Sequence, residues 1–296
     1  MELKEFSKTW QGRAQNSILQ IYDLESGKTT VAARLPQVIE APMWSKDGKS
    51  LVYNSQGRIY RCELSTGEIT HIPTGAVIAC NNDHVLAPDG SGIAVSGNVE
   101  DTLASKIYIY TFASGELREV VSEPRSYLHG WSPDMTTLAY CAGRPVGDSV
   151  EWDIYTCPAA GGGETRLTDA PGLNDGPEYS SDGKTIWFNS TRTGLMQVWK
   201  MNADGSEQTQ MTFDEDMNSW FPHISPDREK VVYLAYHKED LAPGKHLPDK
   251  NVEIRMIPAA GGEPNTLLKL FGGQGSINVN SWSPDSSKFA FVSYEA

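Results

Sequence analysis

The chain has 296 residues, 39% hydrophobic and 21% charged, which is enough apolar material for a packed core and excludes a disordered protein. Its 38 acidic against 25 basic residues give a net charge of −13 without any basic run, which argues against binding to nucleic acid. No stretch approaches the roughly 18 apolar residues of a membrane helix, so no membrane insertion is expected. Residues 1–6 lack the apolar core of a signal peptide, so we expect a soluble cytoplasmic protein, or a periplasmic one if an export signal has been removed.

The first predicted elements show two kinds of turn. Residues 19–22 (Leu-Gln-Ile-Tyr) are typical of a strand, and this strand leads to a glycine turn at Gly27. Residues 45–48 (Ser-Lys-Asp-Gly) then separate two apolar runs at 43–44 and 51–53. Aspartate bonds its own backbone in such a turn, and glycine takes the positive φ that closes a hairpin. Each turn therefore predicts a hairpin.

Both turns recur along the rest of the chain. Aspartate turns, spaced 42, 45, 48, 45 and 58 residues apart, occur at Asp47, Asp89, Asp134, Asp182, Asp227 and Asp285. Glycine turns alternate with them at Gly27, Gly67, Gly115, Gly162, Gly205 and Gly262. Four short strands in a period of about 45 residues are typical of a propeller blade. We predict an all-β, six-bladed β-propeller with four antiparallel strands per blade, formed by residues 1–296 as a single domain.

The order of the two turns predicts how the ring closes. The chain begins with the second hairpin of a blade, at Gly27, and ends with the first hairpin of a blade, at Asp285. Each end therefore holds half a blade. We expect residues 19–22 to pair beside residues 289–292, because this pairing leaves no long sheet edge exposed.

The repeated Ser-Pro-Asp turn resembles the WD40-like repeat of TolB-family propellers. Residues 192–199 (Arg-Thr-Gly-Leu-Met-Gln-Val-Trp) and 202–206 (Asn-Ala-Asp-Gly-Ser) share the resemblance, which covers essentially the whole chain. Similar blades occur in TolB, in the propellers of prolyl-oligopeptidase relatives and in oligogalacturonate lyases, so the resemblance implies the fold and leaves the function open. The lyases hold manganese with histidines and a glutamine at the channel mouth. Their closely spaced ligand motif has no match here, and Gln274 has no neighbouring histidine.

The loops before the innermost strands should face the mouth of the central channel. Seven residues before the turn aspartates stand polar or aromatic side chains, namely Glu40, Asn82, Tyr127, Asp175, Trp220 and Asn278. A strand start needs no such side chains, so they predict a ligand-binding ring. The alternative is that they only solvate a water-filled mouth.

Three of the six histidines lie in the same loops. His84 and His129 stand five residues before their turn aspartates, and His223 stands four before. Converging imidazoles could hold a divalent transition metal such as Zn, Mn or Fe, with Asp83, Asp175 or Gln274 completing the ligands. The alternative is that these histidines are hydrogen-bonded within the mouth and that the protein needs no cofactor.

Two other features complete the prediction. The four cysteines should be buried free thiols, because none forms a Cys-x-x-Cys pair and Cys62 and Cys157 occupy the same register in different blades. Residues 236–251 contain two prolines and show no strand alternation, so they predict a long loop between the second and third strands of the fifth blade. This loop should overhang the mouth as a partial lid, and its lysines should favour an anionic ligand.

We therefore predict a non-catalytic recognition propeller that binds a peptide, a partner protein or a small polar ligand such as a saccharide. The alternative is a metal-dependent carbohydrate-active enzyme, similar to oligogalacturonate lyase, that uses the same mouth. No Gly-x-Ser-x-Gly nucleophile motif is present. The predicted ligand-binding residues are Asn82, Asp83, His84, Tyr127, His129, Asp175, Trp220, His223, Gln274 and Asn278.

Overall fold

The computed structural model describes residues 16–98 and 105–295. Residues 1–6, whose composition bears on an export signal, lie outside this part. Within it, no helix is long and apolar enough to cross a membrane.

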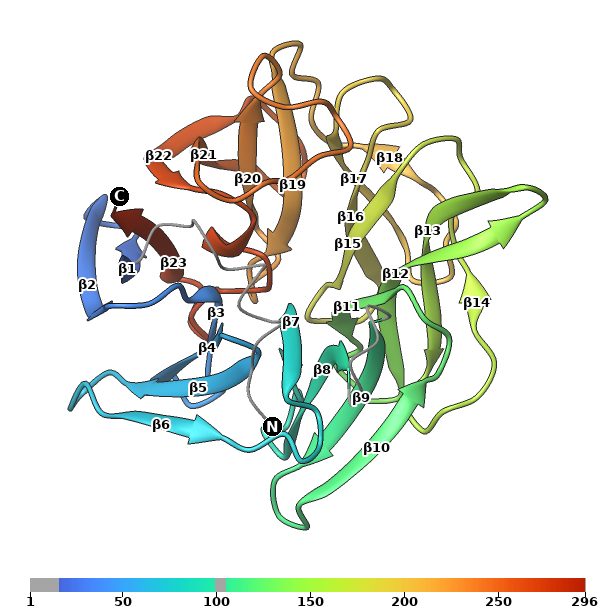
Figure 1. The fold of residues 1–296 in the computed structure, drawn as a ribbon. Coiled ribbons are helices and arrows are strands. Elements are labelled where there is room, and N and C mark those ends of the chain that lie inside the picture. Colours follow the sequence, from blue (N-terminus) through green and yellow to red (C-terminus); the bar gives the residue numbers. More distant parts are fainter. Residues whose placement is uncertain (1–15, 99–104, 296) are drawn as a thin grey trace.

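Six antiparallel sheets stand around a central axis as the blades of a propeller (Figure 1). The first blade contains β3 (Glu40–Trp44), β4 (Ser50–Ser55), β5 (Arg58–Glu63) and β6 (Ile69–Ile72). The second contains β7 (Ala79–Leu86), β8 (Gly92–Asn98), β9 (Lys106–Thr111) and β10 (Glu116–Val121). The third contains β11 (Ser126–Trp131), β12 (Thr137–Val146), β13 (Ser149–Pro158) and β14 (Thr165–Arg166). The predicted fold class is confirmed.

The remaining blades follow the same order from the axis outwards. The fourth contains β15 (Asn174–Tyr179), β16 (Thr185–Ser190), β17 (Gln197–Asn202) and β18 (Thr209–Gln210). The fifth contains β19 (Met217–Ile224), β20 (Lys230–His237), β21 (Lys250–Pro258) and β22 (Asn265–Gly272). The sixth contains β23 (Lys288–Glu295), β1 (Asn16–Asp23) and β2 (Lys28–Leu35), preceded by a 3₁₀ turn at Gln274–Ser276. Its innermost position is taken by the segment before the last turn, which is bridged to β23 between Trp282 and Phe289.

The aspartate turns close the hairpins at the end of the propeller away from the mouth. In the first blade the Ser45 hydroxyl donates to Asp47 Oδ1 over 2.7 Å, and the Lys49 amide donates to the same oxygen over 3.1 Å. The third blade repeats the contact between Ser132 and Asp134 at 2.6 Å. Such local bonds satisfy turn amides that no ladder partner reaches.

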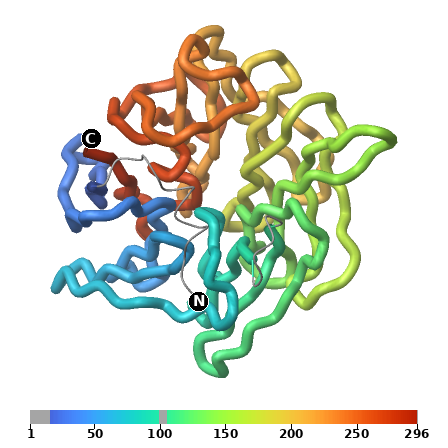
Figure 2. The backbone as a smooth tube through the Cα atoms, in the orientation of Figure 1, coloured from blue at the N-terminus to red at the C-terminus, as the bar shows by residue number. Residues whose placement is uncertain are grey.

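The ring closes by pairing the two ends of the described chain, which lie side by side in Figure 2. Strand β1 runs antiparallel to β23, with Leu19 opposite Val292 and Tyr22 opposite Phe289. The rings of Tyr22 and Phe289 stack with their centroids 5.1 Å apart. The predicted pairing of residues 19–22 with 289–292 is confirmed.

Apolar residues fill the spaces between neighbouring blades. One buried cluster joins the closing strands to the first blade and includes Leu19, Ile39, Tyr53 and Val292. All four cysteines are free and buried, as predicted.

A β-bulge interrupts the innermost strand of each of the first five blades near the mouth. In three blades the bulge is a residue with positive φ followed by proline: Ala41-Pro42, Gly176-Pro177 and Phe221-Pro222. Proline is tolerated at a bulge because the ladder is already broken there. In each of these blades a residue at or beside the bulge lines the mouth, namely Glu40, Asp83, His129, Asp175 and Phe221.

Candidate functional site at the channel mouth

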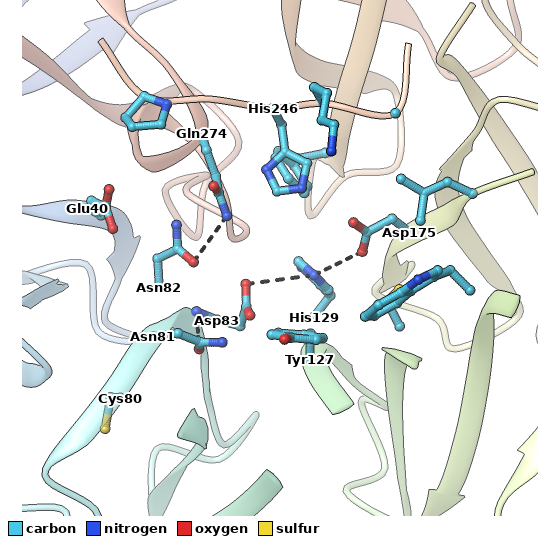
Figure 3. Close-up of a pocket in the computed structure, with 17 residues that line it drawn as sticks. Glu40, Cys80, Asn81, Asn82, Asp83, Tyr127, His129, Asp175, His246 and Gln274 are labelled. Atoms are coloured by element: carbon cyan, nitrogen blue, oxygen red, sulfur yellow. Dashed lines mark hydrogen bonds and ion pairs between the residues drawn. The ribbon is translucent and has the colours of Figure 1, made fainter. Parts of the chain in front are cut away.

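A cavity of about 710 Å³ occupies the mouth of the channel (Figure 3). Its polar lining comes from the first, second and fourth blades and from the 3₁₀ turn, and comprises Glu40, Asn81, Asn82, Asp83, Asp175 and Gln274. Its aromatic lining comprises Tyr127, His129, Trp152 and Phe221. A volume of this size is typical of small-ligand sites, which span about 300–1,000 Å³.

One imidazole joins two carboxylates at this mouth. His129 Nε2 lies 3.4 Å from Asp175 Oδ1 and 3.8 Å from Asp83 Oδ1. The Asn278 amide donates to Asp83 Oδ1 over 2.7 Å, and the Gly176 amide donates to Asp175 Oδ1 over 2.7 Å. The three side chains come from three consecutive blades, so blade packing sets their geometry.

Burial and charge act in opposite directions on these groups. Burial would lower the pKa of His129, but the carboxylates of Asp83 and Asp175 outweigh it and raise that pKa above its ordinary value. Burial also opposes ionisation of Asp175, yet the hydrogen bond and charge of His129 hold the pKa of Asp175 below its ordinary value. The pKa of Asp83 is raised because burial dominates there. His129 and Asp175 thus each favour the charged form of the other.

Amide side chains line the side of the cavity toward the first and sixth blades. Gln274 Nε2 donates to Asn82 Oδ1 over 3.4 Å, and Asn278 Nδ2 lies 3.3 Å from the Asn82 carbonyl oxygen. Gly275 lies against Glu40, because a Cβ atom at Gly275 would come within 2.3 Å of Glu40 Cγ. Only glycine therefore leaves room for the carboxylate at this point.

Aromatic rings also line the cavity. Tyr127 and Trp152 have their ring centroids 5.9 Å apart. Phe221 stacks on His129, with centroids 5.7 Å apart and planes inclined by 20°. The sequence reasoning missed Trp152 and Phe221. The x-Pro pair that marks the bulge could have identified Phe221, but no motif marks Trp152, which reaches the mouth from β13.

The insertion in the fifth blade covers part of the cavity. It joins β20 to β21, as predicted, and contributes Gly244, Lys245, His246 and Pro248 to the lining. Its His246 ring lies 4.5 Å from that of Trp220. The expected positive rim is weaker than the lysine count suggests, because Lys238 pairs with Asp216 over 2.6 Å. Lys245 is the lysine in the cavity lining.

His84 lies outside the cavity, contrary to the predicted mouth position. It is fully buried between the first two blades, where burial lowers its pKa to about 4 against the opposing effect of the Val52 and Ala41 backbones. The bulge is the physical reason. In the second blade His84 pairs with Val95, whereas in the third blade Leu128 takes the equivalent paired position and His129 is the bulged residue. His84 and His129 are thus equally far from their aspartate turns, but their side chains point in opposite directions, and only His129 lines the cavity.

His223 also lies outside the cavity, in a buried network deeper in the channel. Its Nδ1 atom lies 2.7 Å from Glu178 Oε2, and its Nε2 atom lies 3.0 Å from the Ile277 carbonyl oxygen. The Asn280 amide donates to Glu178 Oε1 over 2.6 Å. A carbonyl oxygen can only accept, so Nε2 carries a proton and donates to it. These contacts join the fourth, fifth and sixth blades and give His223 a structural role.

Only some residues of the predicted ligand-binding ring line the cavity. Glu40, Asn82, Tyr127 and Asp175 line the cavity, Asn278 supports Asp83, and Trp220 lies fully buried beneath Phe221 and His246. His84, His129 and His223 do not converge. Among residues 16–98 and 105–295, no group of three or more His, Cys, Asp and Glu side chains has the arrangement of a metal site.

Known proteins resemble the chain over most of its length. An uncharacterized protein of Agrobacterium fabrum is 42% identical over 97% of this chain and 95% of its own. The Tol-Pal system protein TolB of Francisella tularensis is 27% identical over 92% of this chain, and the match spans 60% of that relative's length.

Solved structures show the same architecture. A TolB-like protein from Agrobacterium tumefaciens, 42% identical, superposes with a TM-score of 0.88 over 96% of this chain and 100% of that chain. An oligogalacturonate lyase in complex with manganese is 15% identical, with a TM-score of 0.55 over 87% of this chain and 74% of that chain, which shows likeness of fold alone.

The family described as the TolB beta propeller domain, PD40, matches residues 101–254, more than half of the chain. Together with the closely similar relative and the six-bladed ring, this match shows that the chain belongs to the TolB-like PD40 propeller family.

Proposed function

We propose that the protein is a non-catalytic recognition propeller whose mouth face binds a partner protein, with an extended segment of the partner entering the cavity. The observation that carries this proposal is a set of exposed apolar side chains at the mouth end of the blades. Exposed apolar side chains of this kind mark protein interaction sites when they gather on one face.

Four exposed apolar side chains lie at the mouth end of the blades, two at a hairpin tip and two in loops. Val146 and Val150, 39% and 40% exposed, form the tip of the β12–β13 hairpin. Phe213 in the loop between β18 and β19 is 72% exposed, and Leu247 in the insertion is 47% exposed. Two further large apolar residues of the described part, Val31 and Ile69, are exposed on outer strands.

The cavity complements this surface. Its aromatic and amide side chains can pack against and hydrogen-bond an extended peptide, as partner-binding pockets commonly do. Membership of a family that includes a Tol-Pal system protein agrees with a role in protein binding.

A displayed library of linear peptides, selected on the immobilised protein, tests the proposal. We expect enriched peptides whose binding is lost in Trp152→Ala and weakened in Phe213→Ser. Glu229→Gln serves as the control, because Glu229 is exposed in a turn at the opposite end of the fifth blade. Peptides that bind all three variants equally, or no enrichment at all, would contradict a recognition site at the mouth.

A further inference from the structure

We propose that the cavity recognises a cationic side chain, a lysine or an arginine, in the bound segment. This inference rests on the proposed function and specifies its ligand chemistry. It comes from the carboxylates and the aromatic rings that line the cavity.

Acidic and basic side chains both line the cavity. The carboxyl groups of Glu40, Asp83 and Asp175 lie there together with Lys245 and the imidazoles of His129 and His246. The hydrogen bonds from Asn278 and Gly176 and the contacts with His129 all use Oδ1 of Asp83 and Asp175, so Oδ2 of each carboxylate takes no part in them. An ammonium or guanidinium group can therefore be accepted without breaking the contacts that position the site.

The aromatic wall independently favours a cation. Tyr127 and Trp152 form a tilted pair in the cavity lining, and Phe221 belongs to the same lining. The face of an aromatic ring attracts a positive charge, and more strongly when the charge is desolvated. The same ring faces repel a carboxylate, so the aromatic rings and the carboxylates favour the same ligand charge.

The insertion of the fifth blade carries a positive charge that repels a cationic ligand. Lys245 lies in the lining but is itself exposed on the covering loop, where it reduces the attraction for a second cation. Its charge should set how tightly a cationic segment binds, while the buried carboxylates set the preference for that charge.

Titration calorimetry with capped tripeptides tests the inference directly. The probes are Gly-Lys-Gly, Gly-Arg-Gly, Gly-Glu-Gly and Gly-Leu-Gly, each acetylated and amidated so that only the central side chain differs. We expect the lysine or arginine peptide to bind at least about tenfold more tightly than the other two, and Asp175→Asn to remove that preference. The lysine and arginine arms show which cation is preferred.

Lys245→Glu provides a test that does not depend on altering the buried network. It should tighten binding of the cationic peptide by about two- to fivefold, whereas Glu229→Gln should leave it unchanged. The inference fails if the glutamate or leucine peptide binds as tightly, if no cationic peptide binds, or if Lys245→Glu weakens cation binding. If library peptides still bind the mouth in that case, the proposed function survives without its cationic preference.

Discussion

His129 Nε2 lies 3.4 Å from Asp175 Oδ1, and the two residues belong to neighbouring blades. Asp83, on the other side of the imidazole, belongs to a third blade. The His129 side chain thus lies between two carboxyl groups of the mouth and links the inner strands β7, β11 and β15. Changes of protonation at this point should therefore be measurable as changes in stability.

His129 should stabilise the protein most on the acid side of neutrality. Its pKa is raised in the folded protein, so its contribution is fully present below the unfolded value near 6.5 and is lost as the pH rises through the folded pKa. His129→Gln should therefore destabilise the protein strongly at mildly acid pH, by about 3–5 kcal/mol, and much less at alkaline pH. Urea unfolding of both proteins across this pH range provides the comparison. A difference that does not depend on pH would show that His129 contributes only by packing.

The contribution of His84 to stability should depend on pH in the opposite direction. Its folded pKa, about 4, is below the unfolded value of 6.5, so the unfolded chain binds more protons between these values and stability falls as the pH falls through them. The loss amounts to about 3 kcal/mol at most. His84→Leu, which introduces the residue found at the paired position of the third blade, should remove this acid sensitivity. Equal acid sensitivity of wild type and His84→Leu would disprove the assignment.

Ring closure should depend on the buried face of β1. Leu19 is fully buried between the closing strands and the first blade, so Leu19→Ala should lower the free energy of unfolding by about 2–5 kcal/mol. Val31→Ala is the matched control on β2, because Val31 is 45% exposed and its replacement should cost less than about 0.5 kcal/mol. Chemical denaturation measures both, and similar costs would mean that the closing pair contributes little.

Removing the insertion should expose the rings beneath it. Trp220 is fully buried, with the His246 ring 4.5 Å away, and the Tyr236 hydroxyl donates to the Leu247 carbonyl oxygen over 2.9 Å. A short Gly-Ser linker in place of residues 238–249 should leave the blades folded, shift tryptophan emission to the red and weaken peptide binding. The single substitution His246→Ala is the milder control. An unchanged emission spectrum together with unchanged binding would show that the loop is not a lid.

Much of the fold follows from short-range chemistry, which explains why it could be predicted. The aspartate turns and glycine turns fix where strands end, and their alternation specifies blades, their number and the pairing of β1 with β23. Even the place of the insertion follows from the spacing between Asp227 and Gly262.

The mouth was harder to predict because bulges decide which side chains face it. His84 and His129 stand at the same distance from their turns, yet one is paired in the ladder and the other is the extra residue of a bulge. A shift of one residue reverses the direction of a side chain in a strand. The contact of His223 with Glu178 and the approach of Trp152 depend on neighbouring blades, whose positions no local pattern encodes.

The pairing of β1 with β23 also constrains biosynthesis. Strand β1 is among the first described segments to leave the ribosome, and its partner is the last. The β1–β2 hairpin must therefore wait with one edge unpaired while five blades are synthesised, and such an edge can pair with the same hairpin of another nascent chain. The chain is thus exposed to this pairing until β23 is made, and the pairing of β1 with β23 then covers that edge of the hairpin.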